Sequence, residues 1–123
     1  MRDRRKYFRL AETFPVRFKF IKSALGMSAR TTNVSEDGLR INGLQKIEPG
    51  TPVKLNFHLP EDKNPIMTIG EVMWQNEKQD ANFPSIMGIK FVDISPDDRD
   101  KIRDYIIRKI SNGLNSTGVY EAA

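Results

Sequence analysis

Apolar and polar residues alternate along most of this chain, in short segments separated by turn residues. In residues 14–20, Phe and Val alternate with Pro, Arg and Lys, and in residues 53–59, Val, Leu and Phe alternate with Lys, Asn and His. This period of two, in aromatic and β-branched residues, indicates strands that bury one face. Alternation or richness in Thr and Val predicts four more strands, in residues 27–34, 39–42, 66–75 and 86–92.

The six expected strands follow one another with no helix between them, which argues against parallel βαβ units. After residue 94 the pattern changes to that of a helix. Ser95 is a typical N-cap, Pro96 suits the first helical position, and isoleucines recur at positions 102, 106 and 110. Arg108 and Lys109 are expected in the last turn, with Gly113 just beyond it. The chain is therefore expected to form an antiparallel barrel or sandwich with one helix packed on it.

The composition excludes several functional classes. The 123 residues include no Cys and one His, His58, which is expected to be solvated. A thiolate metal site, a Cys nucleophile and a His-based triad are therefore not expected. No apolar run approaches the roughly 20 residues of a membrane span, and no secretory signal is apparent. We expect a cytoplasmic protein with no membrane insertion, no metal, no cofactor and no catalytic activity.

Positive charge is concentrated at the N-terminus. Residues 1–22 hold eight basic and two acidic side chains, whereas the rest of the chain holds twelve basic and fourteen acidic ones. Arg5 and Arg9 are separated by three residues, two of them aromatic. A guanidinium can bond two phosphate oxygens or the O6/N7 edge of guanine, and it can stack on a base. The alternative interpretation is a solvated basic tail.

A second motif, Asn33-Val34-Ser35-Glu36-Asp37-Gly38, lies between two predicted strands. The Asn and Ser side chains can bond a ligand, and Gly38 can adopt a positive φ and let a ligand approach closely. The alternative is a turn in which the polar side chains bond only their own backbone.

Together the two motifs resemble those of the PilZ domain, a bacterial receptor for cyclic di-GMP, whose pattern is an RxxxR arm followed by [DN]xSxxG. Val72-Met73-Trp74, Met87-Gly88-Ile89-Lys90-Phe91 and the terminal helix also resemble later elements of that family, so that the resemblance runs from Arg4 to Ile110. It implies a six-stranded antiparallel β-barrel with a C-terminal helix. The expected boundaries are a flexible basic arm at 1–12, the barrel at 13–94, the helix at 95–112 and a frayed tail at 113–123.

The resemblance also implies site roles. Arg5 and Arg9 would contact the guanine edges and phosphates of cyclic di-GMP, Asn33 and Ser35 would bond a guanine edge, and Gly38 would allow close packing. Arg4 directly precedes the motif. In similar proteins a basic residue at this position accompanies binding of two ligands per chain, which the resemblance implies here as well. Trp74 would lie near the ligand, with a core position as its alternative. Asn33 stands where Asp is the acidic form of the motif, and an amide pairs with the N1–H and N2–H donors less strongly than a carboxylate.

The leading hypothesis is a cyclic di-GMP receptor whose arm becomes ordered on binding and which then signals to a protein partner. One alternative is a single-stranded nucleic-acid-binding barrel of the OB kind. Confinement of the positive charge to one end argues against it, so no nucleic acid is expected. Another alternative is a PilZ-like adaptor that binds no nucleotide, which the intact motifs argue against.

Overall fold

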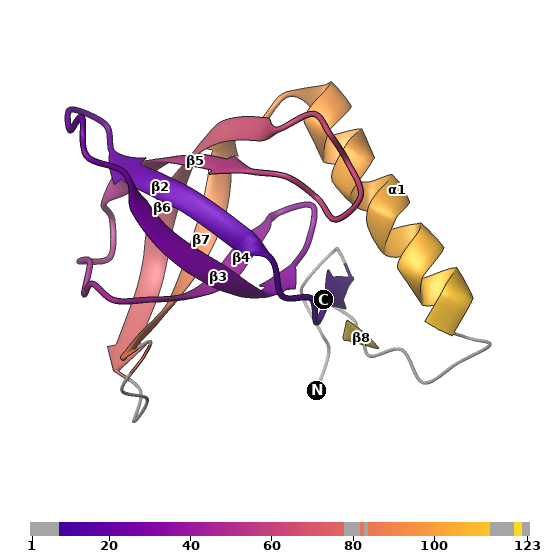
Figure 1. Cartoon of the computed structure of the whole chain (residues 1–123), viewed down its shortest axis with the longest axis horizontal. Coiled ribbons are helices and arrows are strands. Elements are labelled where there is room, and N and C mark those ends of the chain that lie inside the picture. The colour runs from indigo at the N-terminus through magenta and orange to yellow at the C-terminus, as the bar shows by residue number, and fades with distance from the viewer. Residues whose placement is uncertain (1–7, 78–81, 83, 114–119, 122–123) are drawn as a thin grey trace.

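The computed structural model describes residues 8–77, 82, 84–113 and 120–121. Figure 1 shows a barrel of strands with one long helix beside it. The elements of the described residues are β1 (Arg9–Leu10), β2 (Pro15–Phe20), β3 (Met27–Val34), β4 (Gly38–Gly43), β5 (Pro52–Phe57), β6 (Ile66–Glu77), β7 (Ser85–Asp93), α1 (Pro96–Gly113) and β8 (Tyr120–Glu121).

Six of these strands form a closed antiparallel barrel. They lie in the order β2-β5-β6-β7-β4-β3, and pairing of β2 with β3 closes the sheet on itself. Closure leaves the barrel strands without exposed edges. The six-stranded barrel and the C-terminal helix are thereby confirmed. Outside the barrel, β1 pairs with β3, and β8, within the segment expected to be a frayed tail, pairs with β1.

The core follows directly from the alternation in sequence. The inward residues of β2, β4 and β5 are buried, and Val16, Ile41 and Val53 are at most 1% exposed. Within the core, the ring centroid of Phe57 lies 5.8 Å from that of Phe14 and 6.3 Å from that of Phe91. Each fully buried side chain of this kind stabilises the fold by about 1.5–3 kcal/mol relative to exposure. The wall of the barrel is thus fixed from within, and its outer face is available for function.

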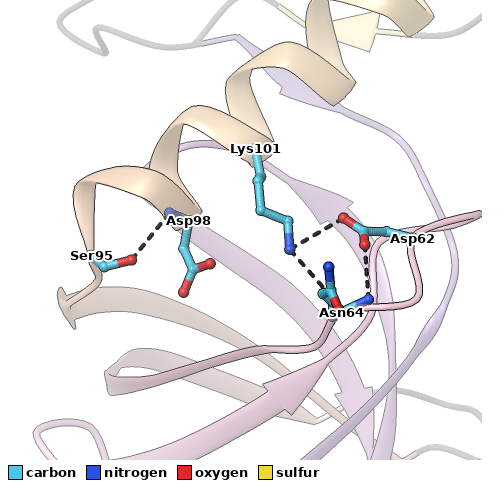
Figure 2. A network of polar contacts seen from close by, with 5 residues as sticks. All are labelled: Asp62, Asn64, Ser95, Asp98 and Lys101. Carbon is cyan, nitrogen blue, oxygen red and sulfur yellow. Dashed lines mark hydrogen bonds and ion pairs between the residues drawn. The ribbon is translucent and has the colours of Figure 1, made fainter.

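The helix begins as its sequence predicts. Ser95 Oγ accepts a hydrogen bond from the backbone N–H of Asp98 at 3.1 Å, the N-cap contact (Figure 2). Ile102, Tyr105 and Ile106 are buried against the barrel. The helix was expected to end at residue 112, but Gly113 is its last residue. Arg108 and Lys109, which were expected in the last turn, precede it, and the last turn holds no basic residue. Sequence signals place helix ends only to within one or two residues.

A polar clamp ties the helix to the loop between β5 and β6. Lys101 Nζ lies 3.2 Å from the Asp62 carboxylate and donates to the Asn64 carbonyl oxygen at 3.3 Å, as Figure 2 shows. Asp62 Oδ1 also accepts from the Asn64 N–H at 2.9 Å. These donors, the Asn64 N–H first and then Lys101, lower the pKa of the Asp62 carboxyl. The clamp therefore favours the ionised form of Asp62.

Candidate functional site

Cross-strand pairing brings an amide, a guanidinium and an indole into one line on the outer wall of the barrel. Asn33 of β3 is paired with Arg40 of β4, Arg40 with Gly88 of β7, and Gly88 with Trp74 of β6. Directly paired residues point to the same face of a sheet. These four residues, which we call the β3–β6 row, come from four strands and from positions between 33 and 88 of the sequence, and only the barrel brings them together.

The first motif reaches this row through β1. Leu10 is paired with Val34 in antiparallel register, so Arg9 lies one position beyond Val34, and its long side chain reaches diagonally to Asn33, where Nη1 donates to Oδ1 at 3.4 Å. If the Asn33 amide is turned over, its oxygen instead accepts from Arg40 Nε at 3.2 Å and Nη2 at 3.3 Å. The buried Asn33 amide thus lies between two guanidiniums, and its single oxygen can serve one of them at a time.

Ser35 organises the turn that follows β3. Its Oγ accepts from the backbone N–H groups of Asp37 at 3.1 Å and Gly38 at 3.2 Å, and its own N–H donates to the Gly38 carbonyl at 2.9 Å. The side chain is 2% exposed. These contacts form a local turn, in agreement with the alternative interpretation of the motif, in which the polar side chains bond their own backbone. Its hydroxyl hydrogen is not used in these bonds and can still be donated.

Two glycines let neighbouring groups approach the backbone. A Cβ on Gly38 would collide with the Ile89 carbonyl oxygen of β7, and a Cβ on Gly88 would collide with the Trp74 indole. The positive φ expected as an option for Gly38 is not adopted; Gly50, with φ 92°, is the described glycine that has one. In this structure the close approach at Gly38 is therefore made by strand β7.

Trp74 lies on the surface, so the alternative interpretation of a core tryptophan was wrong. Its side chain is 38% exposed, next to the exposed Met73. The register of β6 against β7 shifts between Val72 and Trp74, which is a β-bulge. A bulge re-aims a side chain and is common beside functional sites. Here it places the indole over the backbone of Gly88.

Sequence reasoning missed Arg40 and Gly88. Arg40 could have been found from the period of two, since it follows Gly38 by two positions and must share its face. Gly88 lay within the stretch that resembles a later strand of the family, but the sequence carried no sign of a site role for it, because that role depends on an indole from another strand. Arg4 and Arg5 lie outside the described residues, so the structure places Arg9, Asn33, Ser35, Gly38 and Trp74 of the predicted site.

Other candidate chemistry is sparse in the described part of the chain. His58 is exposed, as expected. In residues 8–77, 82, 84–113 and 120–121, no group of three or more His, Cys, Asp or Glu side chains is placed to hold a metal ion. The helix that the structure describes lacks the apolar length needed to cross a bilayer.

Comparison with known proteins identifies related folds. The model of the PilZ domain family matches residues 3–108. The comparison with curated protein sequences found no match.

Solved structures of similar fold include three from two bacteria. The inhibitor of motility (MotI/DgrA) of Bacillus subtilis has a TM-score of 0.78 at 20% identity, over 89% of this chain and 53% of that one. The PilZ domain of YcgR from Escherichia coli with c-di-GMP has a TM-score of 0.70 at 11% identity, over 93% of this chain and 99% of that one. YcgR from Escherichia coli in complex with c-di-GMP has a TM-score of 0.70 at 14% identity, over 93% of this chain and 49% of that one. This chain spans about half the length of MotI and of the longer YcgR chain.

Proposed function

This chain belongs to the PilZ domain family, and on that premise we propose that it is a receptor for cyclic di-GMP with no catalytic activity of its own. One observation carries the proposal. Arg9, the last residue of RxxxR, lies against Asn33, the first residue of NxSxxG, although 24 positions separate them. The two halves of the pattern converge on one outward face, as a shared ligand requires.

The chemistry of this face suits a cyclic dinucleotide. Cyclic di-GMP offers two phosphates and two guanines, which call for planar cations, small polar groups and a flat surface. Arg9 and Arg40 supply guanidiniums for phosphate oxygens or the O6/N7 edge of guanine. Asn33 and the Ser35 hydroxyl supply amide and O–H groups for a guanine edge. The exposed face of Trp74 supplies a surface on which a base can stack.

The remaining assignments come from the family pattern. Arg5 would act with Arg9 on guanine edges and phosphates, and Arg4 would accompany a second bound ligand. Solved YcgR structures hold c-di-GMP, which supports the choice of ligand for this relative. No nucleic-acid partner is proposed.

A signalling mechanism follows from the contact between Arg9 and Asn33. The Nη1–Oδ1 distance of 3.4 Å is at the long limit of a hydrogen bond. A ligand that offers phosphate oxygens to Arg9 and a guanine edge to Asn33 would replace this contact with shorter, charge-assisted ones. The segment before β1 would then change its conformation and cover the row. A partner protein would recognise the altered surface.

Calorimetry with cyclic di-GMP on the full chain tests the proposal. We expect saturable heat, and a loss of affinity of about tenfold or more in Arg5→Ala and Arg9→Ala, since hydrogen bonds to charged groups contribute about 1.5–3 kcal/mol. Arg108→Ala, which removes an exposed guanidinium from the helix, is the matched control and should bind as wild type does. The measured stoichiometry tests the role of Arg4. Absence of heat at tens of micromolar, or equal binding by all three variants, would refute the proposal.

A further inference from the structure

A groove lies on the outer wall of the barrel over β2, β5 and β6. Its volume is about 490 Å³, and its cations and apolar residues include Arg17, Lys19, Lys54, Met67 and Ile69. We call it the β2–β5–β6 groove. Strands β2 and β5 contribute nothing to the β3–β6 row, and β6 lines the groove with Met67 and Ile69 but contributes Trp74 to the row, so that no residue belongs to both. The groove is therefore not part of the cyclic di-GMP site.

The cations of the groove are placed against one another. Lys19 of β2 is directly opposite Lys54 of β5, and Arg17 is in the next row on the same face, opposite Asn56. Like charges directly opposite each other in a sheet are destabilising. None of the three forms an ion pair with an acidic side chain within the described ranges. An anionic partner would relieve this repulsion.

Apolar surface accompanies the charge. Met67, paired with Asn56, is 66% exposed, and Ile69, paired with Lys54, is half-buried. Asp93 closes the far side of the groove opposite Ile69. At the other side, Arg17 extends over the β2–β3 turn, where its Nη2 lies 2.8 Å from the position a Cβ would take on Gly26. The groove thus combines positive charge distributed along two strands with the exposed apolar side chain of Met67.

We infer that the β2–β5–β6 groove docks an acidic, extended segment of a partner protein, with an apolar side chain seated on Met67. Arg17 and Lys19 are two residues apart on one strand, about 6.6 Å. Alternate acidic side chains of an extended peptide repeat at the same spacing. A small anion fits less well, because the cations are spread along two strands and do not converge, and because phosphate gains nothing from Met67 or Ile69. The inference rests on the proposed function, since it names the surface used by the partner of that receptor.

The test is an NMR titration of the full ¹⁵N-labelled chain. The probe is a short synthetic peptide in which Glu alternates with Ser around a central Leu; the control peptide carries Lys for Glu, and inorganic phosphate is a third titrant. We expect the Glu peptide alone to shift the amides of β2, β5 and β6. The double variant Lys19→Glu/Lys54→Glu should weaken peptide binding about tenfold or more. Lys63→Glu/Lys109→Glu, with the same change in net charge on exposed residues outside the groove, should bind as wild type does. Met67→Ser should weaken binding and Met73→Ser should not.

Several results would overturn the inference: no shift with the Glu peptide, equal weakening by both double variants, or phosphate matching the peptide at these amides. Cyclic di-GMP titrated into the same samples separates the two proposals. Lys19→Glu/Lys54→Glu should retain its cyclic di-GMP affinity. A wild-type chain that binds the Glu peptide but no cyclic di-GMP would contradict the proposed function and leave the groove in place as a docking surface, whereas the converse would contradict the groove alone.

Discussion

Asn33 is the central residue of the candidate site, because it is buried between the guanidiniums of Arg9 and Arg40. In one orientation of the amide its oxygen faces Arg9, and in the other it faces Arg40. A carboxylate has two oxygens and a charge, so it could accept from both with charge-assisted bonds. An amide carries no charge, so it leaves the positive charge of both guanidiniums unneutralised, as the proposed anionic ligand would require.

Replacement of Asn33 by Asp should consequently stabilise the fold by about 1 kcal/mol near neutral pH. Paired with two cations, the new carboxyl would have a lowered pKa, so its contribution would be present above the usual Asp pKa of about 3.9 and lost as pH falls through the folded value. Urea unfolding at pH 7 and pH 3 measures the gain and its loss. Asn76→Asp, at an exposed position of β6, should change little. A destabilised Asn33→Asp at pH 7 would mean that the charge is left uncompensated.

Gly38 is required by packing between strands. Substitution by Ala would drive a Cβ into the Ile89 carbonyl, which is backbone and cannot rotate away. We expect a loss of about 2–4 kcal/mol in the free energy of unfolding. At Gly43 of the same strand a Cβ would meet Ala29 Cβ at 3.7 Å and Met87 Cε at 3.8 Å, which are ordinary contacts. Gly43→Ala should therefore cost much less in the same urea titration; equal losses would count against the packing explanation.

At the scale of elements, the pairing of β2 with β5 carries an electrostatic penalty. Lys19→Glu or Lys54→Glu alone would convert a like-charge pair into an opposite pair, and each should raise the free energy of unfolding by about 0.5 kcal/mol. The double variant restores a like-charge pair and should lose the gain. A urea double-mutant cycle at low and high salt checks this. Additive effects that do not change with salt would show that the two side chains do not interact.

The attachment of α1 to the barrel should weaken in acid. The Asn64 N–H and Lys101 lower the pKa of Asp62, so its contribution is present above the unfolded value of about 3.9 and falls away as pH drops through the folded value. Asp62→Asn should flatten the fall in stability between pH 5 and pH 2, whereas Asp97→Asn, at an exposed position in the first turn, should follow wild type. Thermal unfolding over that range tests this, and parallel curves for Asp62→Asn and wild type would contradict it.

At the scale of the whole molecule, Trp74 can report on ligand binding because it is the only Trp in the chain. Its indole is on the β3–β6 row and 38% exposed. Stacking of a base on it should change its emission and shield it from acrylamide. We expect both changes with cyclic di-GMP, and neither in Arg9→Ala at the same concentration. Emission that does not change while calorimetry detects binding would exclude Trp74 from the ligand site.

The barrel and its helix were predictable from sequence because burial of one face imposes a period of two on strands and of 3.6 on helices. The strands expected at 27–34 and 86–92 occur as Met27–Val34 and Ser85–Asp93. β1 was not foreseen, since two residues carry no period and Arg9–Leu10 forms a strand only because Val34 offers it a partner. The β2–β5–β6 groove was likewise invisible, because Lys19 and Lys54 become neighbours only through strand pairing.

The sequence by itself determined the six strands and the helix start at Ser95, because burial and capping leave local patterns in neighbouring positions. It also singled out Arg9, Asn33 and Ser35 as motif residues, through their chemistry and their resemblance to a family pattern. The tertiary structure alone decided which residues meet. Register across β3, β4, β7 and β6 placed Asn33, Arg40 and Trp74 in one row, and a bulge turned Trp74 outward. Contacts between residues far apart in sequence depend on how the strands pair, and that pairing is settled only when the barrel closes around its core.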